Sequence, residues 1–324
     1  MILQYRSYAK YIAVLVTIAL VAILFTQINL GDVISTLTNI NPIYLAAGFI
    51  LYVCSYFFRA WRFHLLLNKE VSIKDLFHIE CVHNMMNNLL PARTGELSYI
   101  YLLKKINTRT TGEGVATLIV SRIFDAIALA IFFFCAILLI RDIPTVILDT
   151  IWLVAIGIII FIIFLVLLLW YGRKFLFWIH KAITFLHIEQ KHWVKYLMKK
   201  GDETVESLDQ INILHNQIYC LVSSLLIWGF NCGMIYFLLA GMGFDLSYLS
   251  IIIGATFILL TTILPIQGIA GFGTTELIWT LVFVSLGLSK NAAIVSGFSY
   301  HILVILFFMI LGIYGWLKIR ILVS

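Results

Sequence analysis

Charged residues are scarce in this 324-residue sequence. Asp, Glu, Lys and Arg make up 12% of the chain, whereas hydrophobic residues make up 62%. Soluble domains carry about 25% charged and about 45–50% apolar residues. Because so few charges cannot cover a water-exposed surface, the composition predicts an all-α polytopic membrane protein. It excludes a cytosolic enzyme, a nucleic-acid-binding protein and a secreted disulfide-rich domain.

Cysteine and histidine motifs are also missing. The five cysteines are scattered through apolar segments without CxxC spacing, and the eight histidines contain no H-x-x-x-H pair. The cysteines are therefore expected to be small hydrophobic side chains. No metal site, no cofactor and no disulfide framework is predicted. No nucleophile elbow is present either, so hydrolysis is not expected.

Long hydrophobic runs recur along the chain instead. A helix needs about 20 residues to cross the roughly 30 Å hydrocarbon core of a bilayer. The first run follows Arg6 and Lys10 and is not followed by an A-x-A cleavage pattern, so we expect an uncleaved span rather than a signal peptide. The predicted transmembrane helices, about six in all, are 11–25, 43–63, 115–140, 147–171, 217–240 and 292–317.

Lys and Arg residues are unevenly distributed between the connecting segments. The segment 172–200 has seven basic residues and one acid, whereas the loops 31–42 and 241–247 have no Lys or Arg. Because cytoplasmic loops are rich in Lys and Arg, both termini are expected to be cytoplasmic, in a multi-pass protein of the cytoplasmic membrane. The other basic residues that we place on the cytoplasmic side are Arg6, Lys10, Arg62, Lys69, Lys74, Lys104, Lys105, Arg109, Lys318 and Arg320.

The basic segment 172–200 also contains aromatic residues, among them Phe177 and Trp178. This pattern favours an amphipathic surface helix that holds anionic lipid headgroups. The ordinary excess of positive charge on cytoplasmic loops already explains part of its composition. Membrane lipids are therefore the expected partners, with no nucleic acid.

Two apolar regions, 76–103 and 248–286, are interrupted and do not fit as ordinary spans. In each, a Leu-Pro step is followed by glycine and then by glutamate. Proline removes a backbone donor and disfavours helix in the residue before it. Broken backbone at membrane depth is tolerated only inside protein or beside water. We therefore predict two re-entrant helical hairpins, whose tips or hinges contain Pro91, Gly95, Pro265, Gly268, Gly271 and Gly273.

The two hairpins predict an internal repeat. Pro91 lies about as far into the segment 43–140 as Pro265 lies into 216–317, and the charge pattern makes the two hairpins enter from opposite sides. Equal spacing with opposite polarity is the signature of an inverted repeat, an architecture typical of carriers. The chain is thus expected to be one integral membrane domain: 1–42 (first span and loop), 43–140 (repeat one), 141–215 (linking span and basic connector) and 216–317 (repeat two).

Ionisable residues inside apolar segments are the main candidates for a site, because each costs about 2.5–3.5 kcal/mol at a helix centre. Arg122 and Asp125 are spaced to pair on one helix face, and either a structural pair or a ligand role is open for Asp125. Arg122 suits a phosphate, since its planar guanidinium donates bidentately. The other buried candidates are Glu80, Arg93, Glu96 and Glu276, with His83 and His301 behind them.

The first break also provides an anion cradle. Arg93 and the free N–H groups of the following short helix would bind an anion, although a pair between Arg93 and Glu96 is the alternative. Glu96 and Glu276 could cap the short helices, orient the arginines or carry a proton. Asn87 and Asn88 satisfy broken-helix backbone or bind a headgroup. The predicted substrate-binding residues are Arg93, Arg122, Asn87, Asn88, Glu96, Asp125 and Glu276.

Three motifs, LLPARTGE (89–96), SRIFD (121–125) and LPIQGIAGFGTTE (264–276), resemble those of the lysylphosphatidylglycerol synthase transmembrane-region family. Its best-known member is the flippase half of the bacterial multiple peptide resistance factor, and the resemblance spans roughly residues 10–318. It implies that Arg93 and Glu96 belong to the first signature, Arg122 and Asp125 to the central one and Glu276 to the last. The chain departs from the family pattern at Ser121, where an acidic residue is common, and in its looser glycine spacing.

The resemblance implies a lipid flippase or transporter. Its substrate would be an anionic or modified phospholipid, or a polyprenyl-phosphate-linked lipid, moved between leaflets of the cytoplasmic membrane. A lipid-modifying enzyme and a second copy of the chain remain open as protein partners. The alternatives are an intramembrane glycosyl- or phosphotransferase acting on lipid-linked substrates, and a small-anion carrier. We expect no enzymatic activity, because no DxD or equivalent acidic motif stands out in the sequence.

Overall fold

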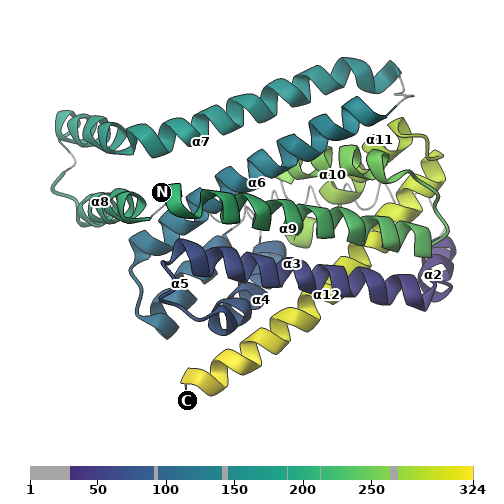
Figure 1. Ribbon diagram of the computed structural model, residues 1–324, viewed down its shortest axis with the longest axis horizontal. Helices are drawn as coiled ribbons and strands as arrows, with labels where there is room; N and C mark the ends of the chain where they lie inside the picture. Colours follow the sequence, from purple (N-terminus) through teal and green to yellow (C-terminus); the bar gives the residue numbers. More distant parts are fainter. Residues whose placement is uncertain are drawn as a thin grey trace.

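The computed structural model of the chain describes residues 30–90, 94–140, 145–187, 189–211, 213–262 and 269–323. Within these ranges helices are the only regular secondary structure, as the composition predicts (Figure 1). The first predicted span, 11–25, lies outside the described residues. So do four predicted site or hinge residues, which are Pro91, Arg93, Pro265 and Gly268.

The helices follow one another in the order shown by their labels in Figure 1. The first group is α2 (Leu30–Thr38), α3 (Pro42–Leu66), α4 (Ile73–Leu89), α5 (Glu96–Asn107) and α6 (Thr111–Leu139). Two connecting helices come next, α7 (Thr145–Phe185) and α8 (His192–Gln210). The last group is α9 (Ile213–Gly241), α10 (Tyr248–Thr262), the short 3-10 turn η2 (Ile269–Gly271), α11 (Thr274–Ser285) and α12 (Lys290–Val323).

Local sequence signals explain where several helices begin. Asn41 caps α3 by accepting a hydrogen bond from the backbone N–H of Ile43, and Pro42 occupies the first helical turn, where its missing N–H costs nothing. Thr110 and Glu113 form a reciprocal capping box at the start of α6. These caps fix the starts of two helices that carry charged residues of the candidate site.

Four described helices are long and apolar enough to cross a membrane, and they match four of the predicted spans. They are Pro42–Leu66, Thr111–Leu139, Asn216–Gly241 and Lys290–Ile321. The predicted span 147–171 differs from the structure at its end. Helix α7 continues to Phe185 and is bent by 73° between Val154–Leu167 and Trp170–Phe185. It is a fifth candidate membrane span only if both pieces are taken as one span. The basic segment 172–200 is thus shared between α7 and α8.

The helices before and after α7–α8 form two groups with the same order of lengths. In α3–α6 and in α9–α12, a long helix is followed by a shorter one, a 12-residue helix and another long one. Helices α3 and α9 run antiparallel and pack along each other (Figure 1). Helix α4 packs against α12, and α10 packs against α6, so each group packs one helix against the final helix of the other.

The basic segments gather at one end of the molecule. Figure 1 shows α5, α8 and the C-terminus at one end, whereas α2 and the end of α11 lie at the other. Lys104, Lys105 and Lys318 therefore share an end, as the distribution of Lys and Arg between loops predicts. Arg62 is an exception, because it lies buried within α3 with 1% of its surface exposed. Counting it as a cytoplasmic loop charge was wrong.

Helices α4 and α12 approach each other closely at glycines of α12. A Cβ atom at Gly315 would lie 2.7 Å from the carbonyl oxygen of His78 and 2.7 Å from Cβ of Cys81. Real Cβ atoms essentially never come so close to other atoms, so a side chain here would push α4 away from α12. Gly157 in α7, in contrast, has no heavy atom within 4 Å of where its Cβ would lie.

We predict that Gly315→Ala lowers the thermal unfolding temperature of the purified protein. Overpacking is expected to lower the free energy of unfolding by about 1–3 kcal/mol. The higher helix propensity of alanine offsets roughly 1 kcal/mol of this loss. Gly157→Ala is the matched control and should unfold at the wild-type temperature or slightly above it. Equal behaviour of the two variants would contradict the close packing of α4 on α12.

Candidate functional site

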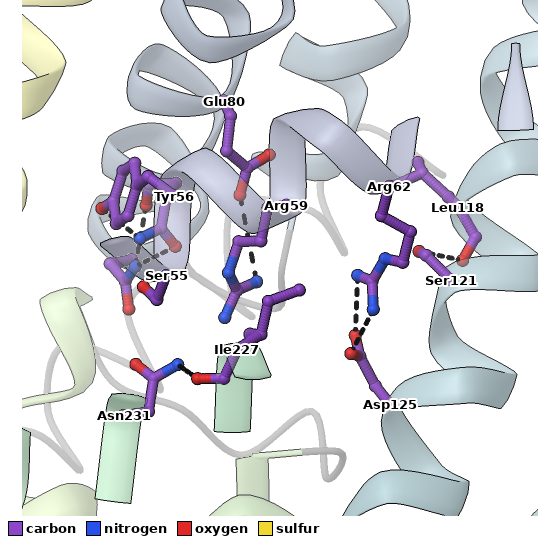
Figure 2. Close-up of polar contacts among 12 residues, drawn as sticks. Ser55, Tyr56, Arg59, Arg62, Glu80, Leu118, Ser121, Asp125, Ile227 and Asn231 are labelled. Carbon is purple, nitrogen blue, oxygen red and sulfur yellow. Dashed lines mark hydrogen bonds and ion pairs between the residues drawn. The ribbon is translucent and has the colours of Figure 1, made fainter. Parts of the chain in front are cut away.

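A buried ion pair joins α3 to α6. The guanidinium of Arg62 faces the carboxylate of Asp125 with both nitrogens, Nη1 at 2.5 Å from Oδ1 and Nη2 at 3.2 Å from Oδ2 (Figure 2). From α9, Ser224 accepts a hydrogen bond from Arg62 Nη1 at 2.5 Å, and the indole N–H of Trp228 donates to Asp125 Oδ1 at 3.2 Å. The pair thus holds three helices together, and each charge is matched by an opposite one.

A second pair, Arg122 with Glu96, lies beside the first and is more accessible. Arg122 Nη2 donates to Glu96 Oε1 at 2.8 Å, and 28% and 32% of the two side chains are exposed. Arg122 Nη1 also lies 3.9 Å from Asp125 Oδ2. The predicted pairing of Arg122 with Asp125 on one helix face is therefore present, but each residue has a closer partner on another helix.

A third pair completes this group of charges. Arg59 Nη1 of α3 lies 3.9 Å from Oε1 of Glu80, which projects from α4 with 1% of its surface exposed (Figure 2). The second oxygen of Glu80 has no hydrogen-bond partner among the described residues. We name the six residues of the three pairs the central charge cluster. Its members are Arg59, Arg62, Glu80, Glu96, Arg122 and Asp125, so three positive charges face three negative ones.

Another acid–base pair lies at the start of α11. Glu276 is fully buried, and its Oε2 accepts a hydrogen bond from the backbone N–H of Gly273 at 2.7 Å, so it caps the helix. Its other oxygen lies 2.5 Å from Nδ1 of His301 in α12. The second ring nitrogen of His301 lies 2.9 Å from the carbonyl oxygen of Ala270 in η2.

The two asparagines of the first signature have different environments. Asn88 donates to the backbone oxygen and side-chain oxygen of Asn84 at 2.8 and 2.9 Å, which is a bond within α4. Asn87 has a buried side-chain oxygen without a hydrogen-bond partner among the described residues. The two predicted headgroup ligands therefore differ in exposure, since the free oxygen of Asn87 is buried whereas Asn88 is exposed.

The predicted hinge glycines that the structure describes have backbone roles. Gly95 lies against the backbone of Met86 and Asn87, where a Cβ atom would overlap α4. Gly271 and Gly273 have φ angles of 76° and 81°, which glycine adopts without steric cost. These glycines therefore allow the tight connections that precede α5 and α11.

Arg59 and Arg62 belong to the central charge cluster but were not predicted as site residues, although the sequence contained a signal for them. Both lie within the predicted span 43–63, three residues apart and therefore on one helix face. Ser224 and Trp228, which bind Arg62 and Asp125, carried no such signal because serine and tryptophan are common in apolar helices. The hydroxyl of Ser121, in contrast, donates a hydrogen bond to the carbonyl oxygen of Leu118 in its own helix, with an oxygen–oxygen distance of 2.8 Å.

A cavity of about 140 Å³ lies between α9, α10, α11 and α12. Trp228 lines it and also donates to Asp125, so the cavity adjoins the central charge cluster. Asn231, Trp279 and Tyr300 are further members of its wall. Because apolar side chains, three of them aromatic, make up most of the wall, the cavity is suited to apolar groups rather than to a second charge.

The chain belongs to the family described as the lysylphosphatidylglycerol synthase TM region, whose model matches residues 11–312. The UPF0104 membrane protein PH1989 of Pyrococcus horikoshii is 22% identical over 308 residues, which cover 88% of this chain and 90% of that protein. The UPF0104 membrane protein MJ1595 of Methanocaldococcus jannaschii is 28% identical over 128 residues, 38% of this chain and 37% of that protein.

A further relative is larger than this chain. The glycosyltransferase AglD of Haloferax volcanii is 28% identical over 120 residues, which cover 36% of this chain and 19% of that protein. The similarity therefore concerns a small part of AglD. No solved structure matches the chain significantly.

We predict that the buried and the accessible ion pairs differ in their effect on stability. Arg62→Ala or Asp125→Ala should destabilise the protein by about 3–5 kcal/mol, because each leaves an uncompensated buried charge. Arg122→Ala removes a pair that is about one-third exposed and should cost about 1 kcal/mol or less. Thermal unfolding of the purified variants measures the difference.

A double variant provides the control. Arg62→Met combined with Asp125→Leu removes both charges and should recover part of the loss caused by either single substitution to Ala. If the single substitutions at Arg62 and Asp125 have no larger effect than Arg122→Ala, then the buried pair does not anchor α3 to α6.

Proposed function

We propose that this member of the lysylphosphatidylglycerol synthase TM region family is a lipid flippase. It moves an anionic or modified phospholipid, or a polyprenyl-phosphate-linked lipid, between leaflets of the cytoplasmic membrane. The observation that carries the proposal is the Arg122–Glu96 pair: an accessible guanidinium among apolar helices, held by a carboxylate that a phosphate can replace.

The two ion pairs have separate roles in this mechanism. Asp125 is bound by Arg62 and Trp228 in the buried part of the bundle, so it positions α6 and, with it, Arg122. Arg122 is bound by one oxygen of Glu96 and is partly exposed. A phosphate on Arg122 would displace Glu96, which is the first residue of α5, and binding would therefore change the position of that short helix.

We further propose that α4–α5 and α10–α11 are re-entrant hairpins in an inverted repeat. A 12-residue helix such as α5 or α11 rises only about 18 Å, less than the roughly 30 Å hydrocarbon core. The two helix pairs lie toward opposite ends of the molecule (Figure 1). Opposed hairpins around a central site would allow access from each leaflet in turn.

The end that carries α5, α8 and the C-terminus is the proposed cytoplasmic end, because Lys and Arg concentrate there. Lys181 and Lys200 lie over the rings of Trp178 and Tyr196, at 5.3 and 5.9 Å from the ring centroids. Such pairs of a cation and an aromatic ring are suited to the headgroup region of a membrane. Helices α7 and α8 would thus contact anionic lipids.

An intramembrane glycosyltransferase is the second candidate, and the similarity of 120 residues to the glycosyltransferase AglD favours it. In that case the central charge cluster would hold a lipid-linked phosphate during group transfer. The two candidates differ in the product, since a flippase relocates its lipid unchanged, whereas a transferase alters it. A small-anion carrier would use the same arginines without carrying a lipid.

The test is leaflet exchange of labelled lipids in liposomes that contain the purified protein. Labelled phospholipids and polyprenyl phosphates serve as probes. We expect Arg122→Ala to slow headgroup-selective exchange about 10- to 100-fold, because a charge-assisted hydrogen bond is worth about 1.5–3 kcal/mol. Arg122→Lys should recover only part of the rate, since lysine cannot bind bidentately. Arg93→Ala should also abolish exchange if the first signature binds the headgroup.

Arg320→Ala is the matched control, because Arg320 lies at the C-terminal end of α12 over the ring of Trp316 and away from the central charge cluster. It should exchange lipid at the wild-type rate. Full exchange by Arg122→Ala would refute the assignment of Arg122 to the headgroup. Chemical conversion of a lipid-linked sugar without exchange would favour the transferase, and transport of free phosphate alone would favour the anion carrier.

A further inference from the structure

The two groups of helices place an acid–base pair at corresponding positions. Glu96 at the start of α5 binds Arg122 of α6, and Glu276 at the start of α11 binds His301 of α12. The partners are 26 residues apart in the first pair and 25 in the second. Arg122 follows the first residue of α6 by the same number of residues as His301 follows the first residue of α12.

The two pairs differ in the chemistry of the base. Arginine remains positively charged at any physiological pH, whereas histidine gains or loses its charge in that range. The Arg122–Glu96 pair is partly exposed, but only 8% of the His301 side chain and none of the Glu276 side chain are accessible. The first position thus holds a permanent cation, and the second holds a buried group that can exchange a proton.

The hydrogen bonds of His301 require a proton between it and Glu276. The Ala270 carbonyl can only accept, so the ring nitrogen Nε2 must be the donor of that bond. In a neutral ring, Nδ1 would then be an acceptor facing the carboxylate oxygen at 2.5 Å. Two acceptors cannot form a hydrogen bond, so a proton lies on Nδ1 or on Glu276, and the pair is neutral overall.

We propose that the Glu276–His301 pair is a proton-binding site that couples lipid movement to proton movement across the membrane. The structure corresponds to the proton-loaded state. When the proton passes to water, the pair changes from neutral to one buried negative charge, and two lone pairs face each other. The contact between α11 and α12 then opens. The coupling to lipid movement rests on the proposed function, whereas the proton binding itself does not.

The backbone next to the pair has a conformation that His301 helps to hold. Ala270, whose carbonyl binds His301, has a φ of 52°, a left-handed conformation that is strained for an L-residue. Phe272 lies with its ring centroid 4.7 Å from that of His301. Loss of the proton would release the histidine that holds this turn, so the backbone of η2 would be free to change.

Few other titratable groups face the pair from the helices that pack against α11 and α12. Helix α10 has no Asp, Glu, Lys, Arg or His, and α2 contributes only Asp32. The remaining charged and histidine residues of the neighbouring helices lie on α4, α5, α9 and α12. They are Lys74, Asp75, His78, Glu80, His83, Glu96, Lys104, Lys105, His215, Lys290, Lys318 and Arg320. Among the described residues, Glu276 and His301 bind each other, the backbone N–H of Gly273 and the carbonyl oxygen of Ala270.

The first test measures proton binding on the purified protein without any lipid assay. Thermal unfolding is followed from about pH 5 to about pH 9, the range of ordinary histidine titration. We expect the wild-type unfolding temperature to fall by several degrees as pH rises. Glu276→Gln should abolish this fall, because its amide can donate to neutral His301 while its oxygen still accepts from Gly273. It therefore imitates the proton-loaded pair permanently.

His180→Gln is the matched control, since His180 also lies near a carboxylate, Asp202 at 4.0 Å, but on the surface. It should retain the wild-type dependence on pH. If Glu276→Gln does not fold, His301→Arg replaces it, because arginine restores the kind of pair found at Glu96–Arg122 and should likewise unfold independently of pH over this range. A wild-type pH dependence that both substituted pairs retain overturns the proposal.

The second test follows leaflet exchange in liposomes with and without a pH difference across the membrane. The wild-type rate should change several-fold with the pH difference, and Glu276→Gln and His301→Arg should lose this response. Proton binding in the first test without any lipid exchange would overturn the proposed function and leave the proton site standing. Lipid exchange that ignores the pH difference would overturn the coupling.

Discussion

A charge in an apolar bundle needs an opposite charge beside it, and this requirement organises the protein. Arg62 and Asp125 come from different helices and face each other with two contacts, so α3 and α6 must adopt one position relative to each other. Ser224 and Trp228 of α9 complete the hydrogen bonds of the same pair. Because removal of one partner would leave a buried charge, the pair also fixes the depth at which Arg122 lies.

The neighbouring ion pairs differ in accessibility. Arg62 is almost fully buried and shared among several acceptors, whereas Arg122, whose nearest described partner is Glu96, is partly exposed. A ligand phosphate competes with carboxylates for guanidinium groups, and it competes most easily where the existing pair is accessible. Two arginines on different helices, Arg62 of α3 and Arg122 of α6, therefore differ in how open they are to a ligand.

The two groups of helices share their order of lengths but not their chemistry. An acid lies in the first turn of each 12-residue helix, and its partner is arginine in the first group and histidine in the second. The Arg62–Asp125 pair has no counterpart with equivalent charges in the second group, where the residue three positions after His301 is Val304. Two groups with the same order of helix lengths thus hold an arginine at one position and a buried histidine at the other.

The sequence by itself determined the helical membrane class and most spans that the structure describes, because a long apolar run has few alternatives to a helix. It also identified most residues of the central charge cluster. Glu96 and Glu276 were correctly placed near the starts of the two short helices. The closest partners of the charged residues, in contrast, were not predicted. Arg122 was matched with Asp125 from local spacing, and Arg62 was assigned to a loop, whereas in the structure Arg62 binds Asp125 and Arg122 binds Glu96. Only the tertiary structure decided these partners, since they lie on separate helices, and no local pattern specifies which charges meet when those helices pack.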